Sequence, residues 1–182
     1  MIESLEIRGF KSIVHLKLNC KRVNLFIGEP NTGKSNILEA IGLLSHIYHG
    51  DVRHFVRFEN MSDLFYDHIL ENKVNINFDE KSLEVTFKDG LFHGRYLDGK
   101  SPERVVFTYS YEGGGGRVDY SDFSQFKFYK FAVRETFPNQ QSEFLRPNGD
   151  NLLAVILSRK ELRVIIKQIF DHFGLSIVFE PP

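Results

Sequence analysis

The sequence predicts an α/β fold in which a strand, a glycine-rich loop and a helix adjoin an antiparallel β-meander and C-terminal helices. Three observations predict it. Residues 28–35 read Gly-Glu-Pro-Asn-Thr-Gly-Lys-Ser, apolar runs flank this loop, and period-two alternation fills much of residues 73–107. We expect one domain over residues 1–182 that is incomplete. Its parts are the strands, loop and first helix in 1–50, an antiparallel β subdomain in 51–135, and a helical segment with the start of a further strand in 145–182.

Three apolar runs precede the first helix and predict three strands. The first opens at Ile2 and ends at Gly9-Phe10, and the second alternates over residues 14–18 with a polar face. Residues 23–27, Val-Asn-Leu-Phe-Ile, are typical of a buried strand that leads into the loop. Two strands therefore come before the strand that enters the loop.

The loop matches G-x-x-x-x-G-K-[ST], the P-loop pattern that binds nucleotide phosphates. Its glycines allow a turn that a Cβ would obstruct, so that backbone N–H groups point at a phosphate. Lys34 supplies positive charge to the β- and γ-phosphates, and the Ser35 hydroxyl is a Mg²⁺ ligand. The expected nucleotide-binding residues are Gly28, Glu29, Pro30, Asn31, Thr32, Gly33, Lys34, Ser35 and Asn36. The sequence thus predicts a P-loop NTPase with ATP and Mg²⁺ as cofactors.

The residues after the loop predict a helix followed by the meander. The apolar face of the helix comprises Ile37, Ile41, Leu44 and Tyr48, with Leu38 beside them. We expect this helix to end near Gly50-Asp51, and a loop with a short helix to follow over 51–71. Strands are predicted at 74–78, 83–87, 91–96 and 104–111, with Asp89-Gly90 as a tight turn. Residues 113–116 are four glycines, which indicate a flexible loop, and residues 126–131 predict one more strand.

The last forty residues predict helices. Asp150 is a plausible N-cap for a helix over 151–157, and Ser158-x-x-Glu161 matches a capping box for a second helix. Its apolar face comprises Leu162, Ile165, Ile166, Ile169, Phe170 and Phe173. Gly174 occupies the position that commonly ends a helix, and a strand is expected to begin at 175–179.

Composition excludes several classes of protein. The net charge of −1 gives no general attraction to nucleic acid, and the 18 Phe residues predict a Phe-rich core. The single cysteine, Cys20, excludes an internal disulfide and fits a reducing compartment. The sequence has neither an apolar stretch of membrane-spanning length nor the layout of a signal peptide. We therefore expect a cytoplasmic protein with no membrane partner.

Residues 2–12, Ile-Glu-Ser-Leu-Glu-Ile-Arg-Gly-Phe-Lys-Ser, followed by a second strand and the P-loop, resemble a known superfamily. They are similar to the N-terminal half of ABC-type ATPase heads of the SMC, RecF and OLD-like families, including related bacterial "AAA family" ATP-binding proteins. Residues 64–67 and 147–155 also resemble segments of these proteins. The resemblance is strong over 1–48 and weak between 70 and 145. It implies an ABC-ATPase-like N-terminal lobe with a mixed sheet beside the meander.

The resemblance also implies site residues and partners. It places Lys11 and Ser12 near the phosphates or adenine, and it implies Gln140 or Gln141 as a glutamine that senses Mg²⁺. Such heads bind ATP between two subunits, so the implied partner is a second copy or a C-terminal ATPase half. By resemblance alone, ATP-dependent dimerisation and hydrolysis would drive a DNA-related or defence activity, with DNA or an effector nuclease as a further partner.

The sequence departs from this pattern where hydrolysis is concerned. A Walker B segment needs about four apolar residues followed by Asp-Glu. Phe78-Asp79-Glu80 is the nearest match, but Asn75 and Asn77 interrupt the run, and residues 177–181 lack the Asp. The tetraglycine tract does not open a helix as a signature loop would. No catalytic residue is therefore assigned, and the isolated chain is expected to bind ATP but hardly to hydrolyse it.

Other interpretations stay open at this point. A complete small P-loop kinase fits the length, although such kinases usually begin with the P-loop strand. A non-hydrolysing, nucleotide-dependent interaction module fits as well. His46, His49 and His54 lie close in sequence, but a zinc site would need further ligands. Lys127 and Lys130 among aromatic residues could bind nucleic-acid bases, but core packing explains the phenylalanines better.

Overall fold

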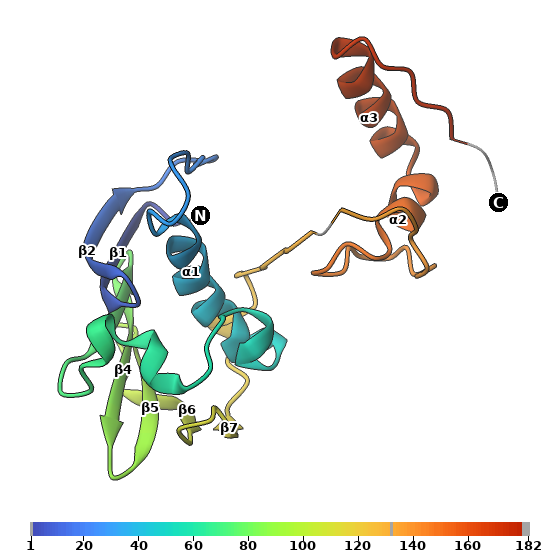
Figure 1. Cartoon of the computed structure of the whole chain (residues 1–182). Helices are drawn as coiled ribbons and strands as arrows, with labels where there is room; N and C mark the ends of the chain where they lie inside the picture. Colours follow the sequence, from blue (N-terminus) through green and yellow to red (C-terminus); the bar gives the residue numbers. More distant parts are fainter. Residues whose placement is uncertain (1, 132, 180–182) are drawn as a thin grey trace. The chain divides into compact units, whose positions relative to one another are not determined.

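The computed structural model describes residues 2–131 and 133–179. It divides the chain into two compact units, Met1–Phe128 and Tyr129–Pro182, and Figure 1 follows the chain through both. The first unit contains the P-loop, the first helix and all strands of the described residues. No helix among the described residues is both long and apolar enough to cross a bilayer.

One antiparallel sheet forms one layer of the first unit. Its order is β2-β1-β3-β4-β5-β6-β7, and every neighbouring pair is antiparallel. The strands are β1 (Ser4–Phe10), β2 (Ile13–Asn19), β3 (Val74–Phe78), β4 (Lys81–Lys88), β5 (Leu91–Leu97), β6 (Arg104–Tyr109) and β7 (Gly115–Arg117). The predicted meander is confirmed, including the Asp89-Gly90 turn, where both residues have positive φ. The expected mixed sheet is wrong for the described residues, because β1 pairs directly with β3 and joins both groups of strands in one antiparallel sheet.

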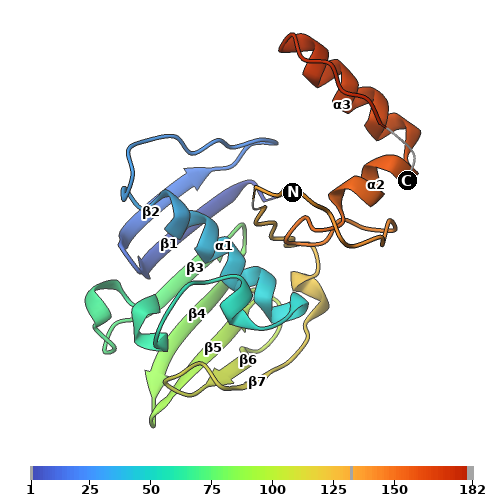
Figure 2. The same cartoon turned by 45° about the vertical axis from the view of Figure 1, so that its right-hand side comes forward.

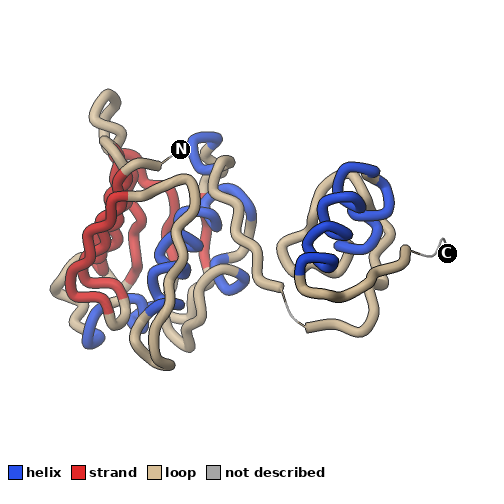
Figure 3. Tube along the Cα trace, turned by 90° about the horizontal axis from the view of Figure 1, so that it is seen from above, coloured by secondary structure: helices blue, strands red, loops and turns tan. Residues whose placement is uncertain are grey.

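Helix α1 (Lys34–His49) lies across one face of this sheet, as Figure 2 shows, and Figure 3 shows the helical and strand layers from above. Its residues Ala40, Leu43, Leu44 and Ile47 are completely buried. The helix ends at Gly50 with φ 145°, as expected. The apolar face differs from the predicted one, since Tyr48 is 41% exposed. The core is Phe-rich, and its fully buried phenylalanines are Phe10, Phe65, Phe92, Phe107 and Phe123.

The segment that leads into the loop is not a strand. Residues 23–27 pair with no other strand of the described chain, and the side chains of Val23, Leu25 and Ile27 are at least 80% exposed. The prediction of a buried strand here is therefore wrong for this structure. A short apolar run favours a buried strand, but a strand forms only when a neighbour satisfies its backbone hydrogen bonds.

Two further predictions in the first unit need correction. The tetraglycine tract is only partly a loop, because Gly115 and Gly116 pair with Tyr109 and Thr108 as the start of β7. A Cβ on Gly115 would lie 2.1 Å from the Thr108 carbonyl oxygen, so the pairing requires a residue without a side chain. The strand predicted at 126–131 does not form in the described residues. Phe126 and Phe128 pack against the core from an extended loop instead.

Three short 3₁₀ helices fill the segment that was predicted as a loop with a short helix. They are η1 (Val52–His54), η2 (Met61–Leu64) and η3 (Tyr66–His68), and a fourth, η4 (Ser121–Phe123), precedes the extended loop. Lys11 N–H donates to the Leu64 carbonyl at 3.0 Å, and Phe10 forms a bridge with Phe65. This segment is thereby attached to the turn between β1 and β2.

The second unit contains α2 (Leu152–Ser158) and α3 (Lys160–His172). The expected N-cap and capping box are wrong, because Asn151 precedes α2 and Ser158 is its last residue, with Oγ donating to the Val155 carbonyl. The expected end of α3 is confirmed by Gly174, whose φ is 71°. The strand predicted at 175–179 does not form in the described part of the chain.

Candidate functional site

The P-loop follows the exposed segment and turns back into α1. Gly33 has φ 85° and Asn31 has φ 63°, both in the left-handed region. The Thr32 hydroxyl donates to the Glu29 carbonyl at 2.9 Å, which closes the turn. The first turn of α1 contains no acidic residue, so the positive end of the helix dipole is not neutralised by the helix itself. The N–H groups at this helix start therefore favour an anion.

The side chain of Lys34 folds back over the loop. Its Nζ donates to the Glu29 carbonyl and lies 3.0 Å from Thr32 Oγ1. A Cβ on Gly28 would be in ordinary contact with both the Thr32 hydroxyl and the Lys34 side chain. The ammonium group is thus held over the loop by acceptors of the loop itself.

A cavity of about 270 Å³ lies at this helix start. It is lined by Ser12, Asn31, Thr32, Gly33, Lys34, Ser35, Asn36 and Arg57. We call it the phosphate pocket. The predicted residues Asn31–Asn36 and Ser12 come together here, while Gly28, Glu29 and Pro30 form the start of the loop. Two lining residues are cationic, and none of the lining residues is acidic.

Lys11, which was expected beside the nucleotide, is engaged elsewhere. Its Nζ lies 2.5 Å from Glu39 Oε2 and donates to the Arg57 carbonyl, and its side chain is only 13% exposed. Lys11 is not among the residues that line the phosphate pocket. Its neighbour Ser12 is, with its Oγ accepting a 2.7 Å hydrogen bond from Asn36 Nδ2. The β1–β2 turn therefore reaches the phosphate pocket through Ser12, and a direct nucleotide contact of Lys11 stays a prediction.

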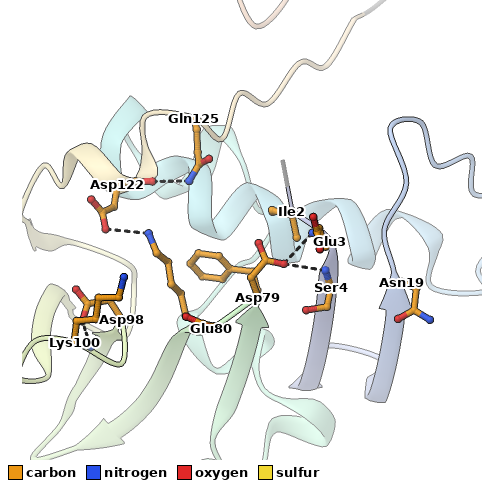
Figure 4. Close-up of a pocket in the computed structure, with 12 residues that line it drawn as sticks. Ile2, Glu3, Ser4, Asn19, Asp79, Glu80, Asp98, Lys100, Asp122 and Gln125 are labelled. Atoms are coloured by element: carbon orange, nitrogen blue, oxygen red, sulfur yellow. Dashed lines mark hydrogen bonds and ion pairs between the residues drawn. The ribbon is translucent and has the colours of Figure 1, made fainter.

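A larger, polar cavity of about 1040 Å³ lies at the other end of β1. Figure 4 shows Asp79 and Glu80 on its wall, with the Asp79 carboxylate directed at the start of β1. The backbone N–H groups of Ser4 and Glu3 donate to Asp79 Oδ1 at 3.0 and 2.8 Å, and these bonds hold the pKa of Asp79 below its usual value. Because β1 has seven residues, this end lies roughly 20 Å from Lys11. The nearest match to a Walker B segment is therefore a turn far from the phosphate pocket.

The remaining candidate residues have other environments. Gln140 and Gln141 belong to the second unit, where the Gln141 carbonyl accepts a hydrogen bond from Asn151, and their role as metal ligands stays a prediction. His46 is fully buried in the core, with Nδ1 bonded to the Leu43 carbonyl. His49 Nε2 lies 3.1 Å from the Ser124 carbonyl. No group of three His, Cys, Asp or Glu residues suited to a metal occurs in the described ranges.

Sequence reasoning missed two residues of this region, Arg57 and Glu39. Arg57 lies in an irregular loop after η1, where no spacing relates it to the P-loop, so only the fold brings it to the phosphate pocket. Glu39 could have been noticed, because it is an acidic residue beside the buried face of α1. A buried carboxylate needs a cationic partner, and its presence would have prompted a search for one.

Comparison with known families agrees with the geometry of this site. A family model described as an AAA ATPase domain matches residues 1–173. The match covers nearly the whole chain, and it includes the phosphate pocket with both Ser12 and Arg57. Membership of such a family implies nucleotide binding.

Proposed function

Because this chain belongs to the AAA ATPase domain family, we propose that it binds Mg²⁺–ATP in the phosphate pocket. One observation carries this proposal. The consecutive residues Asn31–Asn36 line the pocket at the start of α1, where no acidic residue neutralises the positive end of the helix dipole. In this proposal the N–H groups of the loop and the Lys34 ammonium bind the β- and γ-phosphates. Ser35 holds the magnesium ion, which would neutralise charge between the phosphates.

We further propose that the chain is the N-terminal part of an SMC/RecF/OLD-like ATPase and hydrolyses ATP only when a second ATPase half or a second copy completes the site. Hydrolysis needs a carboxylate that holds Mg²⁺ or polarises water, and none lines the phosphate pocket among the described residues. Glu39 is a buried acidic residue beside Arg57, but both of its oxygens are bound to cations. The exposed apolar side chains of Val23, Leu25 and Ile27 support the proposal, because their segment is suited to pair with a further strand.

The biological activity follows from the resemblance alone. In this proposal, ATP-dependent association drives a DNA-related or defence activity, with DNA or an effector nuclease as the partner.

The test is a binding titration of the purified chain with ATP and Mg²⁺, together with an assay of phosphate release. We expect saturable binding with almost no turnover, and loss of binding in Lys34→Ala with the fold retained. Lys73→Ala is a suitable control, because Lys73 is an exposed lysine that pairs with Glu84 away from the pocket. If Lys34→Ala bound ATP as tightly as Lys73→Ala does, the assignment of the pocket would be wrong. Transfer of phosphate to an added acceptor would favour a kinase instead.

A further inference from the structure

Glu39 is a buried carboxylate on the helix that follows the P-loop. The residue is only 5% exposed, and each of its oxygens meets a different cation. Oε2 lies 2.5 Å from Lys11 Nζ, and Oε1 lies 2.5 Å from Arg57 Nε. Burial of a carboxylate is costly unless cations and hydrogen bonds compensate it. The three residues therefore form one charge cluster, which joins α1, the β1–β2 turn and the loop after η1.

Lys11 completes the buried side of this cluster. It has a positive φ of 51°, which turns the chain between β1 and β2. Its ammonium group also donates to the carbonyl of Arg57, so Lys11 fixes the backbone of the arginine while Glu39 fixes the side chain. The next residue, Ser12, lines the phosphate pocket. Of the lining residues, Arg57 is held directly by Glu39, whereas Ser12 is only the chain neighbour of Lys11.

Arg57 is the exposed member of the cluster. Its side chain is 65% exposed and lines the phosphate pocket, yet its Nε is held by Glu39. Among the described residues, its two terminal nitrogens donate to no other group. A guanidinium group that is held through Nε can still present both terminal nitrogens to a phosphate, which a lysine ammonium cannot imitate.

We propose that Glu39 is a positioning residue, which fixes the Arg57 guanidinium at the rim of the phosphate pocket as a second cation for the nucleotide phosphates. This inference rests on the proposed function, because it concerns the same pocket. Lys34 binds the phosphates from the loop side, and Arg57 binds them from the opposite segment. Glu39 itself does not touch the nucleotide, since both of its oxygens are used.

The test is a double-mutant cycle for ATP binding with Glu39→Gln, Arg57→Gln and the double variant. We expect each single variant to weaken ATP binding about ten-fold, the scale of one charge-assisted contact. The double variant should be no weaker than Arg57→Gln, because glutamate acts only through the arginine. Glu84→Gln is the matched control, since Glu84 forms a partly exposed pair with Lys73 elsewhere on the sheet. Circular dichroism at the assay temperature selects variants that are folded.

A second variant keeps the proposal testable if Glu39→Gln does not fold. Arg57→Lys keeps the charge at an exposed position, but a lysine cannot bind Glu39 and a phosphate in the same way. We expect Arg57→Lys to weaken ATP binding nearly as much as Arg57→Gln does. Full affinity in Arg57→Lys, or strictly additive losses in the cycle, would overturn the positioning role.

The two proposals can fail separately. If Lys34→Ala abolishes binding while the Arg57 variants bind normally, this inference fails and the proposed function stands. Unchanged binding by Lys34→Ala would refute the proposed function.

Discussion

The hydroxyl of Ser12 and the side-chain amide of Asn36 are joined by a hydrogen bond of 2.7 Å. This bond connects the β1–β2 turn to the first turn of α1. The Cβ that an alanine would add at Gly33 would lie 3.0 Å from the same Ser12 oxygen. Glycine is therefore needed at position 33 for two reasons: its φ is positive, and the β1–β2 turn approaches it closely.

Gly33→Ala is predicted to weaken both the fold and the pocket. The strained φ of 85° and the close contact with Ser12 should lower the free energy of unfolding by about 1–2 kcal/mol. ATP affinity should fall as well, because the loop N–H groups would shift. Urea denaturation measures the first effect. Gly116→Ala is the control, since its added Cβ would meet nothing within 4 Å; equal stability of the two variants would contradict this prediction.

Gly94→Ala is predicted to disturb the core from the middle of β5. A Cβ there would lie 2.1 Å from Cε1 of Phe107, whose ring covers the glycine from the neighbouring strand β6. Overpacking of this kind should reduce the free energy of unfolding by about 2 kcal/mol. Gly94→Ala should therefore destabilise the Phe107→Leu variant less than it destabilises the native chain. Simple additivity of the two changes in thermal or urea unfolding would show that the ring is not the obstacle.

His46 is predicted to make stability depend on pH. Burial lowers the pKa of His46 to about 4 from 6.5, because the core disfavours its charged form. In the unfolded chain the imidazole binds a proton below pH 6.5, so folding stability is fully present above this value and declines as the pH falls toward 4. At pH 5 the loss should be about 2 kcal/mol.

The measurement is the free energy of unfolding in urea at pH 7.5 and pH 5, for the native chain and for His46→Phe. The variant removes this titrating group and leaves the other histidines in place. We expect its stability to change less between the two pH values. An identical change in both proteins would mean that His46 is protonated in the folded state.

The segment before the loop is predicted to tolerate a charge. Leu25 is 80% exposed, so Leu25→Asp should change the free energy of unfolding by less than about 0.5 kcal/mol. The same change should reduce self-association, because an exposed apolar segment with unpaired backbone groups promotes it. Light scattering and urea unfolding test the two parts. Destabilisation by several kcal/mol would show instead that the segment is buried in the folded unit.

The sequence predicted those elements whose signals are local. Period-two alternation identified β3 to β6, and Asp89-Gly90 identified a hairpin, because side-chain pattern and turn chemistry act over a few residues. The P-loop pattern likewise located the start of α1. Gly50 and Gly174 marked helix ends for the same reason, since both need a backbone conformation that suits glycine.

The failures concern elements that depend on distant partners. Residues 23–27 have the pattern of a strand but no neighbouring strand among the residues that the structure describes, and Phe126 and Phe128 enter the core from a loop. The ion pair of Lys11 with Glu39 was not foreseen, because the two residues lie 28 positions apart in the sequence. Arg57 was missed because a single arginine in an irregular loop carries no pattern. Such contacts follow from the fold and not from spacing.

The most direct test of the central claim is a two-dimensional ¹⁵N–¹H NMR titration of the labelled chain with Mg²⁺–ATP. We expect the largest shifts at the amides of Asn31–Asn36, which line the phosphate pocket, with smaller shifts at Ser12 and Arg57. The shifts should be absent in Lys34→Ala. Shifts confined to the polar cavity around Asp79 and Glu80, with none in the loop, would contradict the account.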